Sequence, residues 1–380
     1  MDLVASRAWT DERRPIRHVD WVLLGVVAVL VVIGLFLLYS ATNQTLRQDG
    51  LDPYTRVKRQ VVTATLGLVL IMVIVSFDYR FFKVYAGFIF AVTMIFMGLL
   101  LIPGVASDTG AFIDIPGFTL LQITPPEFAK LGLLVLIAAI VSELRTPQPE
   151  LRDVVRVVMA AGIAVGLSLL NVEIGSAIVL VAIAVSVLVV AGARSRHLAA
   201  LAVGSAVLIA LAFQLNVVQD YQRERITAFL DREGVSEDLR YNLDQSLIAV
   251  GSGGLVGKGY LEGTQTNLDY VPEQHTDFIF TVVGEEFGFV GSSVVLLLFA
   301  VVLWRAIRIA YLSKDPFGTY VAAGIAAMFA IQMFVNVGMV IGIMPITGLP
   351  LPFLSYGGSA MLVTFASIGM LESIHMRRFK

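Results

Sequence analysis

Long apolar runs recur along this chain and leave little choice of fold. Each is close to the roughly 20 residues that a helix needs to cross the hydrocarbon core of a bilayer. Only 15% of the residues are charged, whereas soluble domains carry about 25%. We therefore predict an all-α polytopic membrane protein with about ten transmembrane helices in a single domain, 1–380. The runs lie near residues 21–41, 60–77, 84–103, 125–142, 154–170, 174–192, 197–214, 278–304, 319–343 and 359–374.

The distribution of Lys and Arg predicts the orientation of these helices. Most of the 27 Lys and Arg residues fall in the N-terminal tail 1–20 and in alternate connections. The side of a membrane protein that is richer in Lys and Arg is the cytoplasmic side, so both termini are expected to be cytoplasmic. The first run is too long for a cleavable signal peptide and is expected to be retained. The long connection 215–277 and the connection 344–358 then lie on the outer side.

Two charged residues fall inside the fourth apolar run, where ionisable groups are costly and usually face the protein interior. Glu127 and Lys130 are three residues apart, so a helix places them on one face, where they can pair. Lys130 is the only Lys or Arg well inside a predicted span. The sequence leaves two interpretations open: a structural ion pair, or a group that binds a ligand.

Three more carboxylates stand at the start of the eighth run. Asp277 marks the point where the long outer connection re-enters the membrane, and Glu285 and Glu286 lie roughly 12 Å deeper along a helix. No cationic partner is close in the sequence, which favours a polar cavity lined by all three. As an alternative, Asp277 is a helix N-cap aided by Thr276. Glu173, between the fifth and sixth runs, is interpreted as an N-cap.

Both outer connections contain segments of special backbone chemistry. Residues 251–259 are rich in glycine but match neither a P-loop nor a dinucleotide fingerprint. Such a turn either brings N–H groups close to an anion or packs as a re-entrant turn. Residues 344–358 hold three prolines and three glycines, which preclude a regular helix. Irregular backbone at membrane depth is tolerated where it lines a cavity, so the two connections are expected to build one site.

Five segments of the second half resemble, in the same order, the signatures of the SEDS family, the shape, elongation, division and sporulation proteins. The expected topology of ten spans with one large outer loop also fits this family. Gly263-Thr264-Gln265 is more similar to the RodA branch of the family than to the FtsW branch. The five segments are Gly251–Gly259, Gly263–Gln265, Pro272–Phe280, Gly284–Gly291 and Gly348–Ser359.

The resemblance implies a peptidoglycan glycosyltransferase that polymerises lipid II into a nascent glycan strand during cell elongation. It places the active site at the outer face of the bacterial cytoplasmic membrane. It implies a class B penicillin-binding protein, a transpeptidase, as the partner beside membrane lipids, and no nucleic acid.

The resemblance also assigns roles to residues. Asp277 corresponds to the family's essential Asp, which as a general base would take the proton of the attacking sugar hydroxyl. The departing lipid diphosphate needs a cation, supplied by Lys130, by Arg or Lys side chains at the outer rim, or by a divalent ion such as Mg²⁺ or Mn²⁺. Glu127 and Lys130 fall on the family's Glu-x-x-Lys pattern. We predict substrate-binding roles for Glu127, Lys130, Gln245, Ser246, Lys258, His275, Thr276, Ser355 and Tyr356.

The first half departs from the family pattern. Where the family carries an Arg-Trp pair, this chain reads Gly110-Ala111-Phe112-Ile113-Asp114, and residues 104–124 contain neither Lys nor Arg. Two other functions therefore stay open: a flippase or transporter for the lipid-linked precursor, and a non-catalytic scaffold that activates the penicillin-binding protein. Polar residues concentrate at one face and no internal repeat is evident, which favours an enzyme over a transporter. The scaffold hypothesis predicts that Asp277 can be replaced without cost.

Overall fold

The computed structural model describes residues 18–102, 123–144, 146, 148–171, 173–214, 225 and 237–378. Their regular secondary structure is helical. The helices are α2 (Trp21–Gln48), α3 (Thr55–Ser76), α4 (Arg80–Val84), α5 (Ala86–Leu99), α6 (Pro125–Ser142), α7 (Leu151–Leu170), α8 (Ile174–Val190), α9 (Ser195–Gln214), α11 (Glu237–Ser252), α12 (Thr264–Asn267), α13 (Ile279–Leu312), α14 (Pro316–Val340) and α15 (Gly358–Met376).

Each of the ten predicted apolar runs coincides with one of these helices. Among the described residues, seven helices are long and apolar enough to cross a membrane, namely α2, α3, α6, α7, α13, α14 and α15. Helices α5 and α8 are shorter apolar helices of 14 and 17 residues, and α9 has 20 residues. Exposed apolar side chains such as Met72, Phe88 and Leu297 lie on the outside of the bundle, which is typical of a surface that faces lipid. The fold is that of a multi-pass membrane protein.

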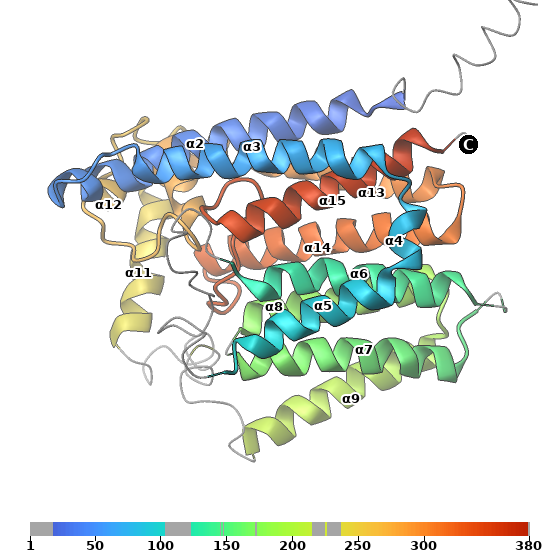
Figure 1. The fold of residues 1–380 in the computed structure, drawn as a ribbon. Helices are drawn as coiled ribbons and strands as arrows, with labels where there is room; N and C mark the ends of the chain where they lie inside the picture. The colour runs from blue at the N-terminus through green and yellow to red at the C-terminus, as the bar shows by residue number, and fades with distance from the viewer. Residues whose placement is uncertain are drawn as a thin grey trace, which may run out of the picture.

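The long helices lie side by side with roughly parallel axes (Figure 1). Helix α15 packs against α3, α13 packs against α14 and α2, and α6 packs against α5 and α8. Helices α11 and α12 lie at one end of the bundle, and the C-terminus lies at the other (Figure 1). The connection from α14 to α15 lies at the same end as α11 and α12 (Figure 1). The Tyr356 N–H also donates to the His275 carbonyl, so the connection 344–358 meets the described part of the predicted loop 215–277. Residues 215–224 and 226–236 of the predicted outer loop, and 1–17 of the tail, lie outside the described residues.

Helix α13 is interrupted at Gly288, whose φ of 62° is a conformation that favours glycine. The glycine-rich segment 253–259 runs along this break. The N–H groups of Lys258 and Gly259 donate to the carbonyls of Glu285 and Glu286, each at 3.0 Å. A Cβ added at Gly257 would lie 2.1 Å from the carbonyl oxygen of Glu286. The glycines therefore permit a packed turn, and helix α13 rather than an anion takes up these N–H groups.

Ion pairs close the opposite end of the bundle. The Arg305 guanidinium of α13 donates to Asp20, just before α2 (Nε–Oδ2 2.6 Å), and the N–H of Asp20 donates to Glu372 of α15 at 3.1 Å. Arg80 of α4 donates to Asp315, just before α14, at 2.9 Å. These bonds fix the long helices relative to one another at the end that is remote from α11 and α12.

Candidate functional site

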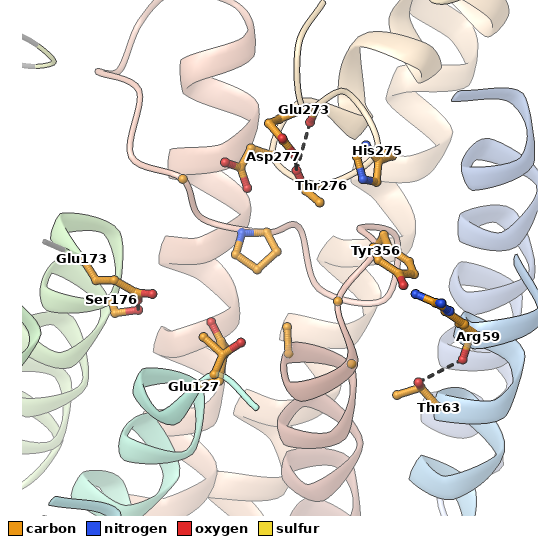
Figure 2. Close-up of a pocket in the computed structure, with 16 residues that line it drawn as sticks. Arg59, Thr63, Glu127, Glu173, Ser176, Glu273, His275, Thr276, Asp277 and Tyr356 are labelled. Carbon is orange, nitrogen blue, oxygen red and sulfur yellow. Dashed lines mark hydrogen bonds between the residues drawn. The ribbon is translucent and has the colours of Figure 1, made fainter. Parts of the chain in front are cut away.

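A cavity of about 310 Å³ lies at the end of the bundle that carries α11 and α12. Its walls come from the starts of α3, α6 and α8, from the turn before α13 and from the connection into α15 (Figure 2). Five of the predicted site residues line it: Glu127, His275, Thr276, Asp277 and Tyr356. The other lining residues are Arg59, Thr63, Thr124, Glu173, Ser176, Glu273, Gly348, Pro350, Gly357, Gly358 and Ala360.

Asp277 lies on the turn that leads into α13. The helix begins at Ile279 with Phe278 as its N-cap, and no side chain makes a capping hydrogen bond, so the alternative interpretation of Asp277 as an N-cap is wrong. Its carboxylate lines the cavity beside Glu273 and Thr276 (Figure 2). Burial, and to a lesser extent the Glu273 carboxylate, raise the pKa of Asp277 to about 6, while the Arg225 guanidinium opposes the rise.

Backbone hydrogen bonds hold this turn in place. Glu273 has a φ of 52°, and its carbonyl accepts the N–H groups of Thr276, Asp277 and Phe278 at 3.2, 3.1 and 3.4 Å. The Thr276 hydroxyl also donates to the Glu273 carbonyl and carboxylate, at 3.1 Å each. Asp277 is thus held in the turn by its backbone, which fixes its position while its carboxylate faces the cavity.

His275 and Tyr356 join this turn to the connection before α15. The Tyr356 N–H donates to the His275 carbonyl at 2.9 Å, and the two rings lie 5.8 Å apart between centroids. Burial, assisted by the nearby Arg56 charge, lowers the pKa of His275 to about 4. The imidazole is therefore neutral near pH 7, so it offers hydrogen bonds to a ligand rather than a positive charge.

Glu127 and Lys130 lie in the first two turns of α6, and Glu127 lies below the Asp277 turn in Figure 2. The prediction that they pair is confirmed, since Lys130 Nζ lies 2.5 Å from Glu127 Oε1. Glu127 lines the cavity, whereas Lys130 is 0% exposed and is not among the lining residues. Lys130 is thus placed to hold the Glu127 carboxylate and to contribute its charge from behind the wall.

Glu173 is a cavity residue that the sequence did not single out as one. It occupies the predicted N-cap position of α8, but it makes no capping hydrogen bond to the backbone. Its carboxylate instead accepts a hydrogen bond from the Ser176 hydroxyl at 2.8 Å and lines the cavity. Burial raises the pKa of Glu173 to about 7, against the effect of the Ser176 bond. The signal in the sequence is the polar stretch between two apolar runs, which an N-cap explains equally well.

Two arginines near the cavity belong to the outer-rim Arg and Lys residues that are candidate cations, although the sequence singled out neither of them. Arg59 of α3 lines the cavity on the side of Tyr356 (Figure 2). Arg225 lies close to Asp277, since a Cβ added at Gly348 would lie 3.6 Å from Arg225 Nη1 and 3.4 Å from Asp277 Oδ2. The family's arginine is missing from the segment 104–124, and residues 104–122 of this segment lie outside the described residues. Arg59 and Arg225 supply positive charge that this segment lacks.

Besides Lys130, four residues with predicted substrate-binding roles do not line this cavity. Ser246 of α11 donates to the Val340 carbonyl at 2.8 Å, and Gln245 lies on the same helix. Lys258 pairs with Glu285, with Nζ and Oε1 2.7 Å apart. The Ser355 hydroxyl accepts the N–H of Leu351 at 2.8 Å. The structure thus gives Ser246, Lys258 and Ser355 bonds that support the walls of the site.

The prediction that Glu285 and Glu286 line a polar cavity is wrong. Both are buried in α13 and absent from the cavity wall. Glu286 accepts hydrogen bonds from the Ser40 hydroxyl and, at 3.2 Å, from the Leu261 N–H. The cationic partner of Glu285 is Lys258, which is 27 residues away in the sequence. The long outer connection folds back on α13 and brings the two side chains together.

A divalent cation is one of the sources of positive charge considered for the leaving diphosphate, and the acidic residues of the wall are its candidate ligands. Glu127, Glu173, Glu273 and Asp277 all contribute to the cavity wall. Within the described ranges, however, no three His, Asp or Glu side chains converge closely enough to hold a metal ion. These residues do not fit a protein-held metal, so no catalytic step is assigned to one.

The fold and the cavity define a polytopic helical membrane protein with a polar site at one end of its bundle. A family model, described as cell cycle protein and grouping FtsW, RodA and SpoVE, matches residues 20–380. The chain therefore belongs to the FtsW/RodA/SpoVE family, the SEDS family that its sequence signatures resemble.

Individual relatives agree with this assignment. The chain is 36% identical over 378 residues to a probable peptidoglycan glycosyltransferase FtsW of Trichlorobacter lovleyi, covering 95% of each chain. It is also similar to a chain of a solved peptidoglycan synthase complex that coordinates polymerization and crosslinking (TM-score 0.78, 29% identity, 95% of this chain and 99% of that chain). The rod shape determining protein RodA of Thermus thermophilus matches with a TM-score of 0.69 at 29% identity, over 95% of this chain and 98% of that chain.

Proposed function

We propose that this protein is a peptidoglycan glycosyltransferase that polymerises lipid II into glycan strands, with Asp277 as its general base. The observation that carries the proposal is the Asp277 carboxylate, which a rigid turn presents to a polar cavity and whose pKa is raised to about 6. A carboxylate of that pKa is mostly ionised at neutral pH yet basic enough to accept a proton. The family membership and the names of the relatives support the same chemistry.

The reaction needs a base on one side of the sugar and positive charge on the other. Asp277 would take the proton from the acceptor hydroxyl as its oxygen attacks the anomeric carbon of the donor. The bond from that carbon to the diphosphate oxygen breaks, and the lipid diphosphate leaves with the electron pair. Arg59 is the cation that we assign to this developing charge, with Lys130 acting from behind Glu127. Arg225 lies beside Asp277 and therefore belongs to the side of the base.

A divalent cation is assigned to the substrate. Because the described acidic residues do not converge on one point, we propose that Mg²⁺ or Mn²⁺, where the reaction uses one, would arrive bound to the diphosphate of the substrate and would neutralise part of its charge. The prediction is that lipid II polymerisation depends on the metal concentration, whereas the protein alone does not bind the metal tightly.

We also propose a topology and a cellular location for the protein. We propose ten spans, both termini in the cytoplasm and the cavity at the extracytoplasmic end of the bundle, in the cytoplasmic membrane of a bacterium. The positive-inside distribution of Lys and Arg supports this orientation. The likeness to a chain of a synthase complex that coordinates polymerization and crosslinking supports a class B penicillin-binding protein as the partner. The Gly263-Thr264-Gln265 segment supports a role in cell elongation, in the manner of RodA.

Two other functions are weighed against this proposal. A flippase needs a substrate path through the membrane, whereas the residues that line the polar cavity lie at one end of the bundle. A scaffold for the penicillin-binding protein does not need a buried carboxylate of raised pKa. Both alternatives predict that Asp277 is dispensable for polymer formation.

The decisive experiment measures glycan-strand synthesis from labelled lipid II by the purified protein together with its cognate transpeptidase, whose own active-site serine is blocked by penicillin. The parent is compared with Asp277→Ala, and folding is checked by size-exclusion profile and melting temperature. We expect polymer from the parent and none from the folded variant. Equal polymer from both, or none from either, would overturn the proposal and favour the flippase or the scaffold.

A further inference from the structure

Asn336 of α14 makes two hydrogen bonds that join separate segments of the cavity wall. Its side chain is fully buried. Its amide nitrogen donates to the carbonyl of Asp277 and to the carbonyl of Leu349, each at 2.7 Å. Leu349 lies between Gly348 and Pro350, which both line the cavity. One amide group therefore binds the turn that carries the general base and the connection that faces it.

We propose that Asn336 is a positioning residue that fixes the Asp277 turn against the connection before α15 and so sets the geometry in which the base meets the acceptor hydroxyl. Asn336 acts through the backbone of Asp277 and does not line the cavity itself. The expected effect of Asn336 on turnover rests on the proposed glycosyltransferase function. Its effect on the relative position of the two segments is independent of that function.

The chemistry of the amide supports this role. Both hydrogens of the Asn336 amide are used, whereas its oxygen Oδ1 is buried without a hydrogen-bond partner among the described residues. The side chain thus serves as a double donor. A carboxylate of the same shape cannot donate, and an aliphatic side chain leaves two buried carbonyls unpaired, which proteins strongly avoid.

The geometry indicates what loosens when the amide is lost. The two segments also meet at the Tyr356 N–H, which donates to the His275 carbonyl, so they stay attached on the side of His275. The side of Asp277 and Gly348 depends on Asn336, and there a Cβ added at Gly348 would lie only 3.4 Å from Asp277 Oδ2. Removing the amide therefore moves the base while most of the cavity wall remains, so turnover should fall more than substrate affinity.

The test uses the full-length protein in nanodiscs with its transpeptidase. Asn336→Leu removes both donors at similar size, and Asn336→Asp keeps the shape but not the donors. The matched control is Gln332→Met, because Gln332 lies one turn earlier on α14, is 4% exposed and makes no hydrogen bond to either segment among the described residues. Polymerisation of labelled lipid II gives kcat and KM, and hydrogen exchange is followed in peptides that cover 273–278 and 349–356.

We expect both Asn336 variants to lose about 10- to 100-fold in kcat, which is the scale of a displacement of about 1 Å at a reacting group, with KM changed less than about twofold. The N–H groups of Asp277, Phe278, Leu354 and Ser355, which are hydrogen-bonded within these segments, should exchange faster. Gln332→Met should change neither kcat nor exchange.

Unchanged exchange in both segments would overturn the proposal even if activity fell, since Asn336 would then act in another way. Equal changes in Gln332→Met would overturn it too, because they would reflect general loosening of α14. If the parent makes no polymer, the proposed function fails, but faster exchange confined to the Asn336 variants would still support the positioning role.

Discussion

Asp277, just before α13, and Glu285, within α13, are eight residues apart, but their carboxylates have different surroundings. Asp277 faces the cavity, and its backbone makes the hydrogen bonds that hold its turn. Glu285 is fully buried, and five donors bind it. They are the Lys258 ammonium, the N–H groups of Gln265 and Thr266, and the hydroxyls of Thr264 and Thr266. A carboxylate whose acceptor sites are filled holds structure, whereas one that faces a cavity can accept a proton from a substrate.

The saturated carboxylate still supports the site. The Thr266 hydroxyl, which donates to Glu285, also accepts a hydrogen bond from the Gln274 amide at 3.1 Å, and the same amide donates to Thr281 at 2.9 Å. Gln274 directly precedes His275. Glu285 therefore anchors the long outer connection to α13 from behind, and the Asp277 turn rests on that anchor.

The largest effect expected from this difference is that of Asp277→Asn. The amide cannot take a proton from the acceptor hydroxyl, so lipid II polymerisation should fall by roughly 10²- to 10⁴-fold, the usual contribution of a general base. Because the backbone of Asp277 makes the hydrogen bonds that hold the turn, the melting temperature should stay within a few degrees of the parent. Polymer yield and thermal unfolding in the same preparation check both halves. A residual rate within tenfold of the parent would contradict the role of Asp277 as base.

Glu285→Gln should show the opposite pattern, with stability lost first. Glutamine cannot accept from all five donors, and Lys258 would lose its ionic partner. Breaking a buried pair costs about 3–5 kcal/mol. Because Lys258 is partly exposed, we expect the free energy of unfolding to fall by about 3 kcal/mol. Activity should fall only as far as the Asp277 turn loosens, by about tenfold.

Glu286→Gln is the matched control for that change. Glu286 is the adjacent buried residue of α13, but it accepts only from Ser40 and the Leu261 N–H among the described residues, so it should cost less stability. The measurement is the melting temperature in detergent or nanodiscs, with polymerisation at a temperature where every variant is folded. Equal losses for the two variants would mean that burial of charge, not the Glu285 network, is what matters.

The role of Asp277 as a base also predicts how activity depends on pH. Asp277 works as a base only when ionised, and burial raises its pKa to about 6. Activity should therefore be near its plateau at pH 7 and above, and should fall about tenfold by pH 5 as the carboxylate takes up a proton. Initial polymerisation rates across this range test the expectation. Glu273→Gln removes a neighbouring negative charge that contributes to the rise, so it should move the inflection to lower pH. An inflection near the ordinary Asp value in the parent would contradict the description of Asp277.

The confirmed predictions rest on patterns between residues that are close in the sequence. The wrong ones concern residues whose partners are distant in the sequence. The presence of a helix at each apolar run follows from the length of that run, and the Glu127–Lys130 pair follows from a spacing of three within one helix. Lys258 and Glu285 are 27 residues apart, and Asn336 lies 59 residues from Asp277. The sequence contains no period or spacing that joins such residues, so the anchor and the positioning amide emerge only when the chain is folded.

The cavity wall illustrates the same limit. It is assembled from the starts of three helices, one turn and one connection, so its residues are close in space but not in sequence. Asp277, His275, Thr276 and Tyr356 could be predicted because each lies in a recognisable segment. Arg59 and Glu173 lie at the ends of apolar runs, where a charged residue ordinarily marks only the membrane boundary.

Replacement of Arg59 is expected to have the smallest effect of these changes. It tests whether the α3 side of the cavity binds the donor while the Asp277 side binds the acceptor. It is a half-buried cation on the wall opposite the carboxylates Glu127 and Glu173 (Figure 2), and we assign it to the diphosphate of the donor. Arg59→Gln should raise KM for lipid II about fivefold, the equivalent of about 1 kcal/mol for a charged contact that solvent weakens. Lys58→Gln is the control, because Lys58 is exposed and pairs with Asp52 on the surface. An increase in KM that appears in both variants would indicate a general effect of surface charge. An increase that persists unchanged at high salt would indicate that Arg59 acts through packing and not through its charge. An effect confined to Arg59 and reduced by salt would place the donor diphosphate on the α3 side of the cavity and leave the Asp277 side to the acceptor.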